Sequence, residues 1–424
     1  MANVNYTTTI LNKMVKETFD AKIQMSYPFN SKTMNRFKKS VVTEDITNIG
    51  RYFDIQVASN ESYASQGTEG GAFPVSNALS DQKALIPYRS QFASFSFTGD
   101  VEDLANNKTL ENALTRIIKD TTQSFDEKQN FFLFGDGNGV LGQIDSISSN
   151  AITMLNSVTY GYGARGVRTN MLINAYDNSG SAYRSGDMLV SSVVQSTNIV
   201  NVDSAAAAIA NDDDDSLVFK SSFGYAPQGF LYHITTSGTW LGLAKGTYTT
   251  LQSTVHDASS ASIDWDMIEL AALKSQNIKG DEAPLYNSLI IMHPVQGKNL
   301  RAATRATSNV QFQSPISGTA KADLLVRDIA PGGQEVLYDS WCSPADIFGV
   351  LLEDWAIEEV APRQLYKHND GNVFIQSLSA ATAYADAKEG RVYARYNVVC
   401  KNPSRQWRIK NVNFTASEVA TNRS

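Results

Sequence analysis

The sequence predicts an α+β fold that combines one long helix, one long β-hairpin and an inserted β-rich domain. Apolar residues recur at helical spacing over about 25 residues within 107–134, roughly twice the usual helix length. Two alternating strand patterns within 51–99 enclose a glycine-rich connection. From 160 to 255, short strand-like runs are separated by Gly, Asn, Asp and Ser turns, which is typical of a small antiparallel barrel or sandwich.

The composition is that of a large folded protein. The 424 residues, 42% hydrophobic and 10% aromatic, are enough for a large core and two or three domains. The net charge is −7 and neither half carries a basic stripe, so tight binding of nucleic acid is not expected. Cys342 and Cys400 are the only cysteines, which excludes a disulfide framework and predicts two buried free thiols. No stretch resembles a signal peptide or a membrane helix, so we expect a soluble protein made in a cytoplasm.

The N-terminal 50 residues are predicted to form a loose arm. Apolar side chains at helical spacing, among them Leu11, Met14 and Phe19, indicate a short amphipathic helix in a polar context. A single apolar stripe with no partner nearby must be buried elsewhere. We therefore expect these three side chains to contact another subunit.

The hairpin predicted over 51–99 has two alternating strands, RYFDIQV and ALIPYRSQFASFSFTG. Pro87 lies inside the second strand and indicates an edge position, because proline cannot donate to a ladder. A connection of about 25 residues is unusual within a compact domain and is commonly bound by a partner. Tyr63, Phe73 and Lys83 are the hairpin side chains that we expect to contact a neighbouring subunit.

The helix predicted over 107–134 is capped at its start by Asn107 or Thr109. Gly135 follows its last apolar residue, where a helix favours a left-handed residue. A helix of this length is a structural spine for the subunit.

The stretch FFLFGDGNGVLG contains a G-x-G-x-x-G pattern at Gly137, Gly139 and Gly142. A dinucleotide site needs that pattern after a strand and before a helix, whereas here a helix precedes it. A calcium loop is excluded as well, because Val140 and Leu141 stand where Asp or Asn and then Gly are required. The stretch is therefore predicted to be a helix end followed by a turn.

The second half returns to mixed α/β character. Helices are predicted at 264–280 and 295–305, a buried strand at 288–294, and closing strands in RVYARYNVVCKN and RQWRIKNVNF. Within the β-rich region, Asp212 to Asp215 are the best candidates for binding a cation, although a solvated acidic loop is the preferred interpretation.

Nothing in the sequence indicates catalysis, a metal or a cofactor. The four histidines, at positions 233, 256, 293 and 368, have no metal-ligand spacing, and we interpret His233 and His293 as structural. There is no G-x-S-x-G elbow. The carboxylates of Glu353, Asp354, Glu358 and Glu359 are interpreted as a solvated strand surface.

The order of these parts resembles the major capsid proteins of tailed bacteriophages of the Hong Kong 97 type. The resemblance is carried by the hairpin 51–99, by the helix 107–134 that ends at FFLFGDGNGVLGQI, and by the closing stretch RVYARYNVVCKNPSRQWRIKNV. The resemblance covers nearly the whole chain. It depends on the order and character of the predicted elements more than on any invariant motif.

The resemblance implies a structural protein of the virion that assembles, in the host cytoplasm, into hexamers and pentamers of an icosahedral head. It also implies a separate scaffolding protein, a portal, possible decoration proteins, and double-stranded DNA enclosed without tight binding. The domains that it implies are an arm (1–50), an E-loop hairpin (51–99), a peripheral domain (100–159 and 346–424), an inserted barrel-like domain (160–255) and an axial domain (256–345).

Some members of that family join subunits through a Lys–Asn bond. By resemblance, Lys83 with Asn397 or Asn402 would be the candidate pair in this chain, although nothing else in the sequence marks an activated lysine. Two alternatives to a phage head also stay open: a bacterial nanocompartment shell, which usually lacks a large β insertion, and a β-rich phage tail or adhesin protein, which would show repeats.

Overall fold

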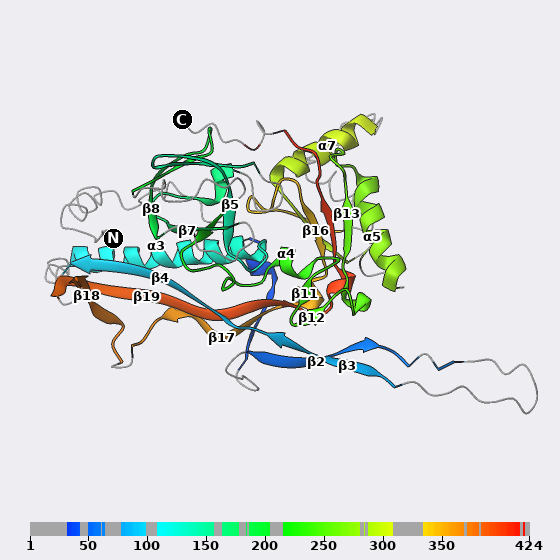
Figure 1. The fold of residues 1–424 in the computed structure, drawn as a ribbon, viewed down its shortest axis with the longest axis horizontal. Helices are drawn as coiled ribbons and strands as arrows, with labels where there is room; N and C mark the ends of the chain where they lie inside the picture. The colour runs from blue at the N-terminus through cyan, green and yellow to red at the C-terminus, as the bar shows by residue number, and fades with distance from the viewer. Residues whose placement is uncertain are drawn as a thin grey trace, which may run out of the picture.

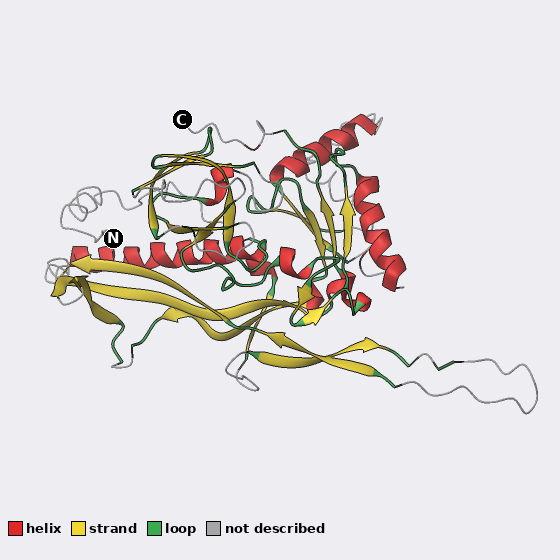
Figure 2. Cartoon of the chain, viewed as in Figure 1, coloured by secondary structure: helices red, strands yellow, loops and turns green. Residues whose placement is uncertain are grey.

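The structure is a computed structural model in which two main sheets and a closed barrel surround one long helix (Figures 1 and 2). None of the described helices is long and apolar enough to cross a membrane. The residues that the structure describes are 32–42, 50–60, 62–63, 78–98, 108–156, 163–177, 184, 186–203, 215–279, 284, 287–307, 334–368, 371–380, 383–415 and 419. The helix expected around Leu11, Met14 and Phe19 lies outside them.

The long sheet is organised around one strand, β19. On one edge, β19 pairs with β4, and on the other edge it pairs with β17 and then β18. The short strand β1 extends the sheet by pairing in parallel with β17. The strands are β1 (Lys38–Val41), β4 (Arg89–Thr98), β17 (Trp355–Leu365), β18 (Phe374–Ala380) and β19 (Ala383–Cys400).

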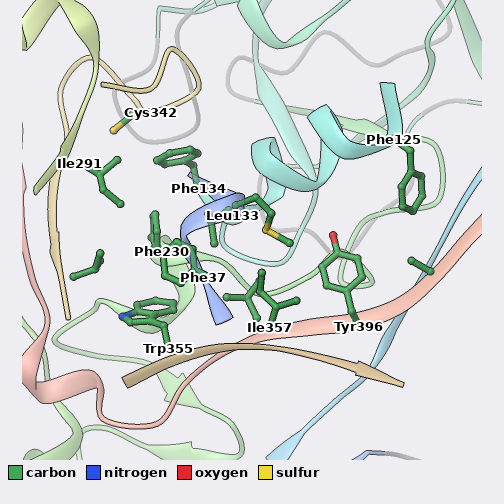
Figure 3. Close-up of a cluster of buried hydrophobic side chains, with 14 of the residues drawn as sticks. Phe37, Phe125, Leu133, Phe134, Phe230, Ile291, Cys342, Trp355, Ile357 and Tyr396 are labelled. Atoms are coloured by element: carbon green, nitrogen blue, oxygen red, sulfur yellow. The ribbon is translucent and has the colours of Figure 1, made fainter. Parts of the chain in front are cut away.

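Helix α3 (Lys108–Leu133) runs along one face of this sheet and confirms the predicted spine (Figure 1). Alternate residues of β19 face the helix, and Tyr396 is 1% exposed beneath it. The aromatic rings of Phe230 and Trp355 meet edge to face, with ring centroids 5.0 Å apart. Figure 3 shows these side chains converging with Leu133 in the main core.

The helix ends in a different way from the one predicted. Gly135 is not left-handed; its amide donates to the carbonyl of Phe132, and the positive φ angles fall at Gly137 (94°) and Gly139 (68°). The carboxylate of Asp136 accepts hydrogen bonds from the amide and side chain of Asn138. The stretch GDGNG is therefore a turn, as expected, but its left-handed residues lie after the helix and not at its cap.

The barrel closes in the order β10-β5-β6-β9-β8-β7 and begins earlier than the expected bound of 160. Its first strand follows the glycine turn directly, and its last ends at Phe219, so residues 220–255 lie outside it. The sequence did not show this because the strand partners are distant along the chain. The strands are β5 (Val140–Ser148), β6 (Ala151–Met154), β7 (Leu172–Tyr176), β8 (Met188–Val194), β9 (Ile199–Val202) and β10 (Ser216–Phe219).

Side chains fill the barrel interior. Ile152, Ala175 and Val190 are fully buried there. At its rim Asp215 is 1% exposed and lies 3.6 Å from the Nε of Arg184, so this aspartate is not part of a solvated loop. Asp212 to Asp214 lie outside the described residues.

The second sheet has the order β13-β20-β16-β14-β15 and carries two helices, α5 and α7, which pack together through a hydrogen bond from the indole of Trp265 to Thr304. Two of its strands, β16 and β20, come from the segment 346–424 that we expected in the peripheral domain. The elements are β13 (Thr254–Asp257), α5 (Trp265–Lys279), β14 (Leu289–Met292), α7 (Pro294–Thr307), β15 (Val336–Tyr338), β16 (Ile347–Val350) and β20 (Trp407–Lys410).

The remaining elements are short. Among the described strands, β2 (Arg51–Ala58) and β3 (Ser80–Ile86) pair only with each other, and Pro87 separates β3 from β4 where a single strand was predicted. Residues around His233 form a short helix, α4 (Phe230–His233), where a strand was predicted. The rest are β11 (Thr239–Trp240), β12 (Leu243–Ala244) and 3-10 turns at Met34–Arg36, Gly163–Gly166, Thr249–Leu251, Leu352–Asp354 and Pro403–Arg405.

The fully buried side chain of Gln406 joins the two sheets. Its Oε1 accepts hydrogen bonds from the amide of Leu351 (2.8 Å) and the indole of Trp355 (3.0 Å). Its Nε2 donates to Asp354 (2.9 Å) and to the carbonyl of Asn402 (3.1 Å). One amide thus fixes the turn from β16 into β17 against the start of β20.

We expect Gln406→Ala to lower the free energy of unfolding by about 3 kcal/mol, because each buried polar group left without a partner costs about 1–3 kcal/mol. Urea unfolding followed by tryptophan fluorescence measures this loss. Gln364→Ala, at an exposed position of β17, is the control and should change stability by less than about 0.5 kcal/mol. Equal losses in the two variants would contradict the assigned role.

Candidate functional site

The most distinctive feature of the subunit is the β2–β3 hairpin, which projects away from the long sheet (Figure 2). Successive residues of the hairpin strands alternate between the body of the subunit and solvent. Phe53 and Val57 face the body of the subunit, whereas Tyr52 is 44% exposed on the other face. Further out, Tyr63 is 91% exposed and Leu79 is 60% exposed. The outer part of the hairpin therefore presents apolar side chains that the subunit does not cover.

The inner face of the hairpin rests on a small apolar surface, here called the seat. The rings of Phe53 and Trp240 meet edge to face at 6.1 Å. The amide of Leu85 donates to the carbonyl of Leu241 over 2.9 Å. The seat consists of Trp240, Leu241, Leu243, Leu251 and Val399.

A buried polar group holds the seat in place. His233 is fully buried; its Nδ1 accepts a hydrogen bond from the indole of Trp240 (3.0 Å), and its Nε2 therefore donates to the carbonyl of Val398 (3.0 Å). Burial lowers the pKa of His233 to about 3, which keeps the ring neutral. His233 thus has the structural role predicted for it.

Lys245 is also fully buried at this position. Its Nζ donates to the carbonyl oxygens of His233 (2.7 Å) and Thr235 (2.8 Å). Burial lowers the pKa of Lys245 to about 8, because the charged form is poorly solvated there. The ammonium ties the start and end of the β11–β12 hairpin together at an electrostatic cost.

The long sheet exposes an aromatic surface on the face opposite α3. Phe92 is 54% exposed, and its ring lies 4.8 Å from that of Tyr393 and 5.7 Å from that of Tyr366. The His368 ring extends the group, 5.0 Å from Tyr366. We call Phe92, Tyr366, Tyr393 and His368 the aromatic patch. Such rings are favoured at protein interfaces because they bury large areas with few rotatable bonds.

The structure places the sequence-predicted contact residues in different surroundings. Tyr63 and Lys83 are exposed, the latter opposite Asp54 in the hairpin register. Asn397 is fully buried: its Nδ2 donates to the carbonyl of Pro87 (2.8 Å) and its Oδ1 accepts from the amide of Gln228 (2.9 Å). Phe73, like Leu11, Met14 and Phe19, lies outside the described residues.

Asn402 is half-buried and accepts a hydrogen bond from the hydroxyl of Ser404 over 2.7 Å. The burial of Asn397 and the local bonding of Asn402 favour structural roles for both side chains. A covalent bond from Lys83 to either asparagine stays a prediction.

Sequence reasoning missed one residue at the base of the hairpin. Glu358 was expected on a solvated surface but is 3% exposed. On β17, Trp355 and Ile357 face α3, so Glu358 points to the opposite face, which usually meets water. The hairpin base covers that face of the sheet. Its Tyr88 lies 270 positions from Glu358 along the chain, so no local sequence pattern predicts this burial.

The described residues contain no group of three or more His, Cys, Asp or Glu side chains arranged to hold a metal ion. The thiols of Cys342 and Cys400 are buried, and burial raises the pKa of each well above its usual value. Both are therefore poor nucleophiles.

No family model matches this sequence, and no curated protein matches it. Among solved structures, the cyanophage A-1(L) capsid asymmetric unit matches with a TM-score of 0.55 at 11% identity, covering 93% of this chain and 96% of that chain. The capsid of the native GTA particle matches with a TM-score of 0.45 at 11% identity, covering 93% of this chain and 96% of that chain. The capsid of Myoviridae phage XM1 gives 0.46 at 7% identity, covering 97% and 100%.

The fold assignment depends on the cyanophage structure, whose TM-score exceeds 0.5. Its coverage of nearly all of both chains shows that this protein has the Hong Kong 97-type capsid fold. The predicted fold class is therefore confirmed, and α3 is its long spine helix.

The depressed pKa of Lys245 predicts that stability rises with pH between about 8 and 10.5. In this range the unfolded chain still binds the proton whereas the folded protein has lost it, so raising the pH favours folding by up to about 3 kcal/mol. Below about pH 8 both states are protonated and the cost is fully present. Denaturant unfolding at several pH values, with Lys245→Met for comparison, measures the effect. The difference in unfolding free energy between wild type and variant should change by that amount across the range, and a constant difference would contradict the assignment.

Proposed function

We propose that this chain is the major capsid protein of a tailed bacteriophage. Copies of it form hexamers and pentamers, and these build an icosahedral head that encloses double-stranded DNA. The observation that supports this is a capsid fold with a projecting hairpin whose outer side chains Tyr63 and Leu79 are 91% and 60% exposed. Apolar side chains on such a projection become favourable only when another copy buries them.

Two features of the structure distinguish this function from the alternatives. A long spine helix such as α3 is not expected of a repetitive tail or adhesin protein. A closed barrel inserted between Val140 and Phe219 is not expected of a bacterial nanocompartment shell, which usually lacks a large β insertion. The role is structural, without catalysis or a cofactor.

The proposed parts of the capsid subunit follow the sheets. The long sheet with α3 is the peripheral domain, and the sheet with α5 and α7 is the axial domain at the centre of each hexamer or pentamer. The barrel is the inserted domain, and the arm 1–50 and the β2–β3 hairpin contact neighbours. Assembly takes place in the host cytoplasm with a scaffolding protein and a portal. The net charge of −7 suits an inner wall that encloses DNA without binding it tightly.

The aromatic patch is the surface on which we place a neighbour's hairpin. The patch carries the exposed ring of Phe92 beside half-buried rings, and the outer hairpin carries exposed Tyr63 and Leu79, so both surfaces gain from losing water. The interface is heterologous, because different surfaces of two copies meet, and such contacts form rings when the rotation between copies closes.

The test of this function is assembly of the full chain, expressed alone and together with the scaffolding protein of the same genome. Negative-stain microscopy should show closed shells. Deleting residues 61–78 leaves Ser59, Asn60 and Leu79 between the last paired positions, Ala58 and Ser80. This variant should keep a cooperative melting transition but form no shells. Subunits that never assemble under any condition would refute the proposal, and a deletion variant that assembles normally would refute the role of the hairpin.

We further expect Phe92→Ser to reduce the yield of shells at least about tenfold, since burying a phenylalanine side chain contributes about 1.5–3 kcal/mol at each of many equivalent contacts. Sedimentation of assembly reactions measures the yield. Val194→Ser, at a 38% exposed position of the barrel, is the matched control and should assemble like the wild type. Normal assembly of Phe92→Ser would show that the patch is not an interface.

A further inference from the structure

The two legs of the hairpin leave the body of the subunit through one narrow point. The first cross-strand pair joins Arg51 to Ile86. Before it, Gly50 has a φ of 152°, and a Cβ at this position would lie 2.1 Å from the carbonyl oxygen of Ile86. The legs are therefore in contact where the hairpin begins, and whatever holds this point sets the direction of the whole projection.

One buried carboxylate holds both legs. The Oε1 of Glu358 accepts from the guanidinium of Arg51 (3.3 Å), at the start of β2. Its Oε2 accepts from the hydroxyl of Tyr88 (3.1 Å), just after β3. Burial, together with the adjacent Glu358 carboxylate, raises the pKa of Tyr88 far above its usual value, so the hydroxyl stays protonated and remains a donor.

The residue opposite Glu358 reinforces this contact. Glu358 of β17 pairs in register with Asn397 of β19, and paired residues project on the same face of a sheet. Asn397 donates to the carbonyl of Pro87, one residue before Tyr88. Two neighbouring side chains of the long sheet thus bind consecutive residues of the leg that joins β3 to β4.

The chemistry of this contact differs from that of the seat. Apolar contacts on the seat are non-directional and allow small rotations of the hairpin. A hydrogen bond from each leg to the same carboxylate fixes an orientation, because hydrogen bonds have preferred angles at donor and acceptor. Glu358 is 3% exposed, so water does not replace a lost partner easily.

We propose that Glu358 is a positioning residue that sets the direction of the hairpin relative to the long sheet before another copy binds it. The inference rests on the proposed function, because the direction matters only when the hairpin must meet a neighbour. Glu358 makes no contact with the neighbour itself; it acts through Arg51 and Tyr88.

The test compares Glu358→Gln with Glu359→Gln in the full chain. Both are charge-removing changes on β17, and Glu359 faces the other way, where its carboxylate lies 3.7 Å from the Nζ of Lys39. Hydrogen exchange of the unassembled subunits, read by mass spectrometry, reports the protection of the amides in β2 and β3. Glu358→Gln should raise their exchange rates about tenfold and leave α3 unchanged, whereas Glu359→Gln should leave the hairpin unchanged.

A double variant tests whether Arg51 acts through Glu358. If it does, Arg51→Met combined with Glu358→Gln should exchange within about twofold of Glu358→Gln alone, because the partner of Arg51 is already lost. Additive effects of the two changes would overturn the shared contact.

Assembly provides the second readout. Glu358→Gln should form shells at a lower yield than Glu359→Gln. Unchanged hairpin exchange, an equal increase in α3 and the hairpin, or normal shell yield would each overturn the proposal. Failure of the wild type to assemble would refute the proposed function instead, and the exchange measurements on free subunits would still report whether Glu358 holds the hairpin.

Discussion

The packing of α3 against one face of the long sheet is the contact on which the rest of the subunit depends. Leu133 and Ile357 are fully buried in it, and Trp355 and Tyr396 are at most 2% exposed. Burial of side chains this large contributes about 1.5–3 kcal/mol each, enough to order α3 on the sheet. The barrel starts where this helix ends, and the hairpin begins on the opposite face of the same sheet. The barrel and the hairpin are therefore both positioned by α3 and the long sheet packed against it.

The two faces of the long sheet have different tasks. The face under α3 is a continuous apolar core, whereas the opposite face combines the aromatic patch with the buried polar pair Glu358 and Asn397. Apolar packing stabilises the fold but does not fix the orientation of the parts that it joins. Buried polar contacts fix an orientation, at a cost in desolvation. By the proposal above, the first face stabilises the chain and the second sets the direction of the hairpin.

Sequence periodicity predicted the elements that are stabilised locally. The stripe over 107–134 gave α3 to within one residue at each end, because helical spacing is repeated in it many times. Sequence periodicity did not predict the features that depend on contacts between distant segments. Glu358 is buried by the hairpin base, and the extent of the barrel depends on the pairing of Val140 with Val218, which no local pattern encodes. Leu11, Met14, Phe19 and Phe73 lie outside the described residues, and their contact with another copy stays a prediction.

The pairing of Val140 with Val218 means that the barrel enters and leaves the subunit at one point. The amide of Phe219 donates to the carbonyl of Gly139 across the same junction. The two ends of the barrel segment are therefore adjacent, and the rest of the chain accommodates the domain as it would a short surface loop. Domains with adjacent termini can be exchanged at such a junction without moving the surrounding scaffold. The barrel is thus a replaceable module, and the same position suits the genetic fusion of foreign domains for display.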